Sequence, residues 1–237
     1  SFDLAAYARL ALGAFLLLVG CGLLAWPFAR LCGVPAKTLV PPMLFNNSGN
    51  IGLPLALLAW GEAAMPAAVI LFMVENTLHF TLGARWLDPQ ARLLMLWRIP
   101  VVFAAIAGLL VATLKITLWA PLLIGIKMLG DISVPLMLFA LGVRMTGFTL
   151  NDWQLATASA VLRPLAGMVI AWGIIHLLGL EGRDAAMLLV FGALPPAVLN
   201  FLFAERYRQE PQRVASIVLI GNLAALFFLP LALALVL

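Results

Sequence analysis

The sequence predicts an all-α integral membrane protein, and three observations support this fold class. Of the 237 residues, 65% are hydrophobic and only 10% are charged, and the mean hydropathy is +1.11. The apolar residues form segments of about 20 residues, the length that an α-helix needs to cross a bilayer. Charged residues or Pro and Gly separate these segments. A soluble domain of this size could not hide so much apolar surface from water, so water-soluble enzymes are disfavoured.

About eight segments qualify as membrane spans, with boundary errors of about 2 to 4 residues. In chain order they cover residues 5–29, 38–60, 65–86, 99–117, 120–146, 153–180, 184–204 and 213–236. Basic residues bound the first five, namely Arg30, Lys37, Arg85, Lys115 and Arg144. The polar stretches "GLEGRD" and "ERYRQE" separate the last three.

The basic residues at the span ends predict the orientation of the chain. One side collects Arg30, Lys37, Arg85, Arg92, Arg98, Arg144, Arg206, Arg208 and Arg213, and the other has Arg9, Lys115 and Arg183. By the positive-inside rule the first side is cytoplasmic. We therefore expect a multi-pass protein of the inner or plasma membrane, with both visible termini on the outer side.

Two spans contain helix-breaking sequences near their middle. Asn47 to Pro54 lie within "LFNNSGNIGLPLAL", and Ala193 to Asn200 lie within "GALPPAVLN". Pro lacks an N–H, and Gly and Asn favour non-helical geometry, so both segments are expected to unwind. An unpaired backbone group in hydrocarbon costs several kcal/mol, so such breaks persist where protein, water or ligand satisfies them. Two breaks therefore predict a cavity near the bilayer midplane.

An internal repeat relates the two breaks. An offset of 146 residues superposes Trp26 on Trp172, Gly33 on Gly179, Lys37 on Arg183, Phe45 on Phe191 and Asn76 on Asn222. Five spans separate the matched helices, and an odd number reverses direction, so the units are predicted to be inverted copies. Residues 1–97 form a first unit with three visible spans, and residues 98–237 form a second with five. We expect roughly 50 residues, two further helices, before Ser1.

The polar groups of the breaks predict an anion site. Asn46, Asn47, Asn50 and Asn200 carry amides that both donate and accept, and half-helix N-termini add N–H groups. The prolines at the breaks are Pro54, Pro195 and Pro196. The alternative for each break is a Pro/Gly kink at which Asn side chains pack helices together.

Several ionisable or amide residues within spans are candidates for ion coupling. Glu75 lies in mid-span beside Asn76, with His79 one turn later. A charged carboxylate costs about 2.5 to 3.5 kcal/mol there, so Glu75 should face a cavity or be protonated. We expect Glu75 to sense protons or sodium, assisted by Asn76 and Asn222, against the alternative of a buried structural hydrogen bond. Asp131 is a further candidate. Asp131 and Arg163 could pair or meet substrate, against the alternative of a structural pair or a polar contact at a helix end.

Three stretches carry a family resemblance: "NNSGNIGLPL", "GDISVPLMLFALGVRM" from Gly130, and "LPPAVLNFLFAERYRQEPQRVASIVLIGN" from Leu194. They resemble the auxin efflux carrier family, which includes bacterial members and the plant PIN-FORMED carriers. The resemblance implies about ten helices in two inverted units, with the fourth and ninth broken and crossing at the substrate. Carried over by position, Pro54 falls on the first crossover with Asn46, Asn47 and Asn50, and Pro195 and Pro196 fall on the second with Asn200. It also implies a mobile domain of helices three to five and eight to ten. The scaffold would be helices one, two, six and seven.

These expectations combine into a secondary carrier, expected to act in efflux, that moves a small organic anion by alternating access. The absence of a plant-type cytoplasmic loop after Arg85 favours a bacterial-type carrier of carboxylates. We expect no cofactor or metal, no nucleic-acid partner, and a possible homodimer. The alternatives are a channel or receptor using the same cavity and an intramembrane enzyme, disfavoured because no acid–base pair or metal group is evident.

Overall fold

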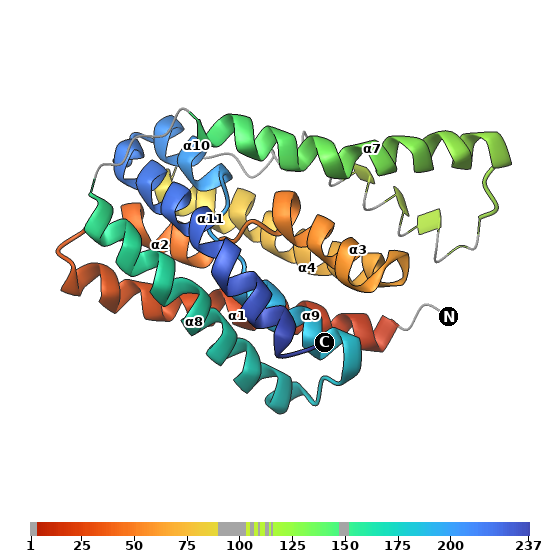
Figure 1. Ribbon diagram of the computed structural model, residues 1–237, viewed down its shortest axis with the longest axis horizontal. Helices are drawn as coiled ribbons and strands as arrows, with labels where there is room; N and C mark the ends of the chain where they lie inside the picture. The colour runs from red at the N-terminus through yellow and green to blue at the C-terminus, as the bar shows by residue number, and fades with distance from the viewer. Residues whose placement is uncertain are drawn as a thin grey trace.

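The computed structural model describes residues 4–89, 103–104, 107–108, 110–111, 114, 116–146 and 152–237. The described chain is built of helices (Figure 1). The α-helices are α1 (Leu4–Leu31), α2 (Ala36–Leu44), α3 (Leu53–Trp60), α4 (Met65–Leu78), α5 (Ala84–Leu87), α7 (Ala120–Met145), α8 (Trp153–Leu178), α9 (Gly182–Ala193), α10 (Leu199–Arg206) and α11 (Pro211–Ala234). Two π-helical turns, η1 (Ser48–Gly52) and η3 (His79–Gly83), and a 3-10 turn, η2 (Glu62–Ala64), join some of them.

Four helical segments within the described residues are long and apolar enough to cross a membrane. They are Tyr7–Leu31, Glu62–Leu87, Trp153–Leu178 and Pro211–Ala234. The all-helical membrane class predicted from composition is therefore confirmed. The predicted spans 38–60 and 184–204 are each two shorter helices, α2 with α3 and α9 with α10, separated by the breaks. The predicted span 120–146 coincides with α7. Most of the predicted span 99–117, including Lys115, lies outside the described residues, and so do Arg92 and Arg98.

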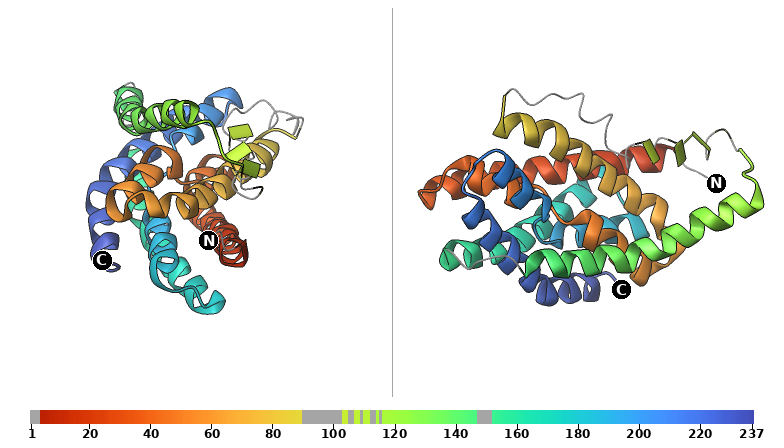
Figure 2. Two further views of the ribbon diagram at one scale, coloured as in Figure 1. Left: turned by 90° about the vertical axis from the view of Figure 1, so that its right-hand side faces the viewer. Right: turned by 90° about the horizontal axis from the view of Figure 1, so that it is seen from above.

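Most of the helices pack into one bundle, from which α7 stands apart (Figure 2). Helix α1 packs against α2, α4 and α8, while α8 also packs against α9 and α11. The main core contains Leu10, Leu71 and Met187, all essentially inaccessible. Helix α7 lies along one side of the bundle and reaches it mainly through η1.

The outer faces of the bundle are apolar, as a bilayer requires. Leu23 on α1, Val169 on α8 and Leu226 on α11 are 70%, 69% and 78% exposed. Exposing such apolar surface to water costs free energy, whereas exposing it to hydrocarbon does not. Most of the polar side chains that are buried in the described residues lie instead near the two breaks, although Thr38, Ser159 and Ser216 bond residues away from them.

Glycine allows α8 and α9 to approach closely next to the second break. A Cβ added to Gly192 would lie 2.5 Å from the carbonyl oxygen of Gly167, and one added to Gly167 would overlap the carbonyl oxygen of Gly192. Any side chain at either position would therefore push the helices apart. This contact brings α8 side chains within reach of the end of α9.

Candidate functional site

The first break begins where α2 ends. Phe45 is extended, with φ −93° and ψ 117°, and its N–H still donates to Pro41 O. The helix resumes as a wide π-turn, because the N–H groups of Ile51 and Gly52 both donate to Asn47 O at 3.1 Å. Pro54 follows at the start of α3, where its missing N–H costs little.

The second break lies between α9 and α10. Leu194 leaves the helix at φ −58° and ψ 142°, and two prolines, Pro195 and Pro196, follow it. A residue that precedes proline is driven out of the helical region, and proline itself cannot donate to the preceding turn. The helix restarts at Leu199.

The two breaks supply each other's missing backbone hydrogen bonds. Asn46 and Pro196 form an isolated antiparallel bridge. The Asn47 N–H donates to Pro195 O at 2.8 Å, and the Ala197 N–H donates to Phe45 O at 3.0 Å. Backbone groups that would otherwise be orphaned in hydrocarbon are thus satisfied. The breaks therefore touch, as the sequence analysis expected.

Two asparagine side chains reinforce this crossing in a reciprocal manner. Asn46 Nδ2 donates to Phe191 O at 3.0 Å, and Asn200 Nδ2 donates to Phe45 O at 3.0 Å and to Ala197 O at 2.9 Å. An asparagine amide has two hydrogens to donate. Asn200 uses both and Asn46 uses one, so in this conformation only Asn46 keeps a free amide hydrogen. The side-chain oxygens of both residues lack a partner within the described residues.

Asn222 on α11 ties both breaks together. Its Oδ1 accepts from Asn47 Nδ2 at 3.0 Å, and its Nδ2 donates to Pro196 O at 3.0 Å and to Val218 O at 2.8 Å. It is 7% exposed. A single amide therefore contacts one residue of each break.

Asn76 on α4 is bonded in a comparable way. Its Nδ2 donates to Phe72 O at 3.1 Å, four residues earlier, as Asn222 does to Val218 O. It also donates to Glu75 Oε2 at 3.3 Å. Asn76 therefore contacts the carboxyl group and its own helix, and it is half-buried.

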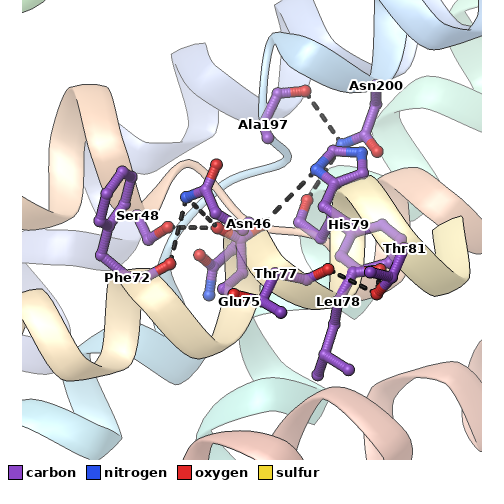
Figure 3. Close-up of polar contacts among 12 residues, drawn as sticks. Asn46, Ser48, Phe72, Glu75, Thr77, Leu78, His79, Thr81, Ala197 and Asn200 are labelled. Carbon is purple, nitrogen blue, oxygen red and sulfur yellow. Dashed lines mark hydrogen bonds and ion pairs between the residues drawn. The ribbon is translucent and has the colours of Figure 1, made fainter. Parts of the chain in front are cut away.

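Glu75 and His79 are buried against the first break (Figure 3). Ser48 Oγ, in the first turn of η1, donates to Glu75 Oε2. His79 Nδ1 lies 3.8 Å from Glu75 Oε1. The imidazole stacks on Phe45, with ring centroids 4.0 Å apart and planes 6° apart. An acid and an imidazole thus lie next to the crossing.

Arg163 brings a buried positive charge to the second break. Its Nη1 donates to Gly192 O at 2.8 Å and to Leu194 O, the carbonyls at the C-terminal end of α9. These carbonyls carry the negative end of the helix dipole, so a cation is favoured there. Arg163 is 1% exposed, and its Nε has no partner among the described residues.

Two cavities adjoin the crossing. One of about 10 Å³ is lined by Asn46 and Glu75 together with apolar side chains, and it has room for about one water. The other, of about 280 Å³, is apolar and lies between α1, the end of α2 and η3, with Phe45 and Trp86 in its wall. The polar cavity is thus small in this conformation.

Some predicted site residues lie away from this cluster or have other partners. Asp131 is exposed on α7 and lies 3.6 Å from Lys127. Of the alternatives left open for Arg163, the structure shows the polar contact at a helix end rather than a pair with Asp131. Lys127 also bonds Glu62 at 2.6 Å. Asn50 is half-buried on η1, beside the crossing.

The contacts of Ser48 and of the carbonyl oxygens of Phe45 and Phe191 were not predicted from the sequence. Ser48 lies inside the quoted polar cluster, and its spacing from Glu75 gives no signal that the two meet. The Phe45 and Phe191 match in the repeat was the available clue, because the same two residues accept the reciprocal Asn bonds.

Comparison with known proteins supports a transport role. Residues 89–233 match the family described as "Membrane transport protein". The chain is 28% identical over 196 residues to the "Putative malonate transporter" of Rhizobium meliloti (strain 1021), covering 76% of this chain and 60% of that protein. It is 25% identical over 186 residues to "Auxin efflux carrier component 6" of Arabidopsis thaliana, covering 76% of this chain and 30% of that protein.

The chain thus spans 60% and 30% of the lengths of these two relatives. The family match covers more than half of the chain and includes the second break and α11. The chain belongs to the membrane transport protein family, the auxin efflux carrier family that its motifs resemble.

Proposed function

We propose that this chain is part of a secondary carrier that moves a small organic anion by alternating access, with the anion bound where the two breaks cross. The observation that carries the proposal is the antiparallel bridge between Asn46 and Pro196. Two interrupted helices that meet inside a bundle of a membrane transport family are typical of midplane substrate sites.

The proposed architecture is a pair of inverted units, residues 1–97 and 98–237, in a fold of about ten helices. The paired contacts support it. Phe45 and Phe191 both accept a hydrogen bond from the Asn of the opposite break, and Asn76 and Asn222 both bond the carbonyl four residues earlier. An offset of 146 residues relates both pairs.

The proposed anion site uses donors that the crossing does not consume. The first N–H groups of η1 lack intrahelical partners by helix geometry and bear partial positive charge. The free amide hydrogen of Asn46 and the half-buried Asn50 lie nearby, and Arg163 adds positive potential. The helix breaks are formed by Pro54, Pro195 and Pro196. The side chains of Asn47 and Asn200 stabilise the backbone at these breaks.

The proposed substrate class is small carboxylates. A relative that matches 76% of this chain is named for malonate transport, and another is an auxin efflux carrier component. Malonate and auxin share a carboxylate, which suits the N–H donors and the positive charge described above. Transport direction is part of what the assay below measures.

The proposed moving part is the packed bundle of α1 to α5 and α8 to α11. These helices share one main core, whereas α7 touches the bundle mainly through η1. A body with its own core can move against a separate helix without losing its packing. We assign α7 to the scaffold, and a second copy of the chain is a proposed partner.

The proposed orientation places the basic end of the bundle in the cytoplasm. Contacts gather the predicted cytoplasmic segments at one end: Lys37 Nζ donates to Leu87 O at 3.1 Å, and Thr38 donates to Glu210 at 2.7 Å. Arg213 pairs with Asp152 at 2.8 Å. The visible termini lie away from this end (Figure 1). The positive-inside rule then places both termini on the outer side of the cell membrane.

The test is transport by the protein expressed from its complete reading frame and reconstituted into liposomes. The panel is radiolabelled malonate, succinate and indole-3-acetate. We expect saturable uptake of at least one, and counterflow when unlabelled substrate is loaded inside. Currents far above carrier turnover would indicate a channel instead, and formation of a new product would indicate an enzyme. Absence of uptake across the panel would refute the carrier proposal.

A further inference from the structure

The buried acid next to the crossing has an oxygen that the fold does not use. Ser48 and Asn76 both donate to Oε2 of Glu75. Oε1 receives no hydrogen bond from the described part of the chain, although the residue is only 4% exposed. An unpartnered buried carboxylate oxygen costs free energy, so its retention calls for a ligand or a proton.

The imidazole of His79 stands between this oxygen and the second break (Figure 3). Its Nδ1 is 3.8 Å from Glu75 Oε1, and the ring also interacts with the Asn200 side chain. Within the described residues, both His79 Nε2 and Asn200 Oδ1 lack a hydrogen-bond partner. A small adjustment lets Nε2–H donate to Oδ1, which would satisfy both atoms.

The ring of His79 is held in place by aromatic contacts. It stacks on Phe45 and meets Phe203 edge-on at 4.8 Å between centroids. A polar chain therefore runs from Ser48 in the first break through Glu75 and His79 to Asn200 in the second. A proton gained or lost on the Glu75 and His79 pair changes the hydrogen bonds offered to both breaks.

The buried charges set how many protons the site needs. Arg163 from α8 interacts electrostatically with Glu75, and Cys21 from α1 interacts with Arg163. With His79 neutral and Glu75 ionised, the charges of Arg163 and Glu75 cancel. An anion bound at the crossing would leave one uncompensated negative charge in a medium of low dielectric constant. One proton on the pair restores neutrality.

The small cavity favours a proton over a metal cation. Its only unpartnered side-chain oxygens among the described residues are Asn46 Oδ1 and Glu75 Oε1. Hard cations take about six oxygen ligands, and the cavity of about 10 Å³ holds about one water. Such a water can donate to both oxygens and connect the acid to Asn46.

We propose that Glu75 and His79 form the proton-binding pair of the carrier, and that one proton crosses with each negative charge of the anion. The inference rests on the proposed carrier function. The proton binds the pair from one aqueous side while the anion occupies the crossing, and both leave on the other side. The hydrogen bond from Ser48 to Glu75 and the contact of His79 with the Asn200 side chain tie this exchange to the two breaks.

The test measures accumulation of the radiolabelled panel in proteoliposomes, with the membrane potential clamped at zero. At a proton gradient of one pH unit, the accumulation ratio should rise about tenfold for a monoanion that crosses with one proton, and about a hundredfold for a dianion that crosses with two. A pH-sensitive dye inside the vesicles should report acidification that depends on substrate. Accumulation without a response to the proton gradient, or driven by sodium alone, overturns this inference and leaves the carrier function standing. No uptake of any panel member refutes the carrier function itself.

Variants separate proton coupling from folding. Glu75→Gln keeps the size and can still accept from Ser48 and Asn76, but it does not titrate. We expect it to retain counterflow while its response to the proton gradient falls from about tenfold or a hundredfold to none. His79→Gln should weaken the same response. Glu62→Gln is the matched control, because Glu62 is exposed and paired with Lys127. A wild-type response in Glu75→Gln overturns the proposal, and should that variant not fold, the dye measurement on the wild type decides.

Discussion

Replacing Arg163 with methionine is expected to destabilise the second break strongly. The guanidinium makes two buried hydrogen bonds, to the carbonyls of Gly192 and Leu194, and methionine makes neither. Hydrogen bonds that involve a charged group contribute about 1.5 to 3 kcal/mol each. The loss is therefore about 3 to 5 kcal/mol, the range for removing one partner of a buried charged contact.

Thermal unfolding of the purified protein in detergent measures this loss. For a chain of this size, each kcal/mol shifts the midpoint by about 2 to 4 °C, so we expect a fall of about 6 to 20 °C. Arg183→Met is the matched control, because Arg183 is an exposed residue in the first turn of the same helix α9. A fall in Arg163→Met no larger than in the control would refute the idea that this guanidinium holds the break.

Three further substitutions test the packing and the chemistry of the crossing. Gly192→Ala should lower stability by about 1 to 3 kcal/mol, because the added methyl meets the Gly167 carbonyl. Gly173→Ala is the control, since its added methyl meets nothing within 4 Å and should not lower stability. Chemical denaturation measures both variants. Asn222→Ala should reduce the apparent substrate affinity about tenfold, because both breaks lose a contact of about 1 kcal/mol, and uptake kinetics check this. Asn46→Asp should abolish saturable uptake, because a negative charge would face the bound anion, and retained uptake would remove Asn46 from the proposed site.

The positions of the helices and of both breaks were predictable from the sequence. Helix breakers such as Pro54 and Pro196 inside apolar runs leave few alternative positions for a break. An unpaired backbone group is too costly in hydrocarbon unless a partner lies close to it. Where the structure describes them, predicted span ends differ from the observed helix ends by no more than three residues, for example 5–29 against Leu4–Leu31 and 65–86 against Glu62–Leu87. The length of an apolar segment is a property of the local sequence, so the local sequence suffices to predict a membrane span.

The partners of the buried polar groups were less predictable. The sequence left open whether Arg163 pairs with Asp131, meets substrate or makes a polar contact at a helix end. The structure shows the last, because α8 packs on α9 and brings Arg163 to the carbonyls at the end of α9. The Asn200 amide was expected to meet substrate, but both its hydrogens go to carbonyls. The partner of a buried polar group depends on which helices pack together, and the spacing of residues along the chain does not encode helix packing directly.

The inverted repeat stays a prediction, although its matched residues proved informative. Phe45 and Phe191 accept equivalent hydrogen bonds, which composition and periodicity alone would not suggest. The polar chain through His79 escaped sequence reasoning for a different reason. The π-helical turn η3 that carries this residue has no recognisable signal in the sequence "HFTLG".

A structure of the complete protein with a transported carboxylate tests the central claim most directly. We predict density for the anion beside the bridge of Asn46 and Pro196, within hydrogen-bonding distance of the proposed donors, namely Asn46, Asn50 or the first N–H groups of η1. An anion bound elsewhere in the bundle, out of reach of these donors, would contradict it.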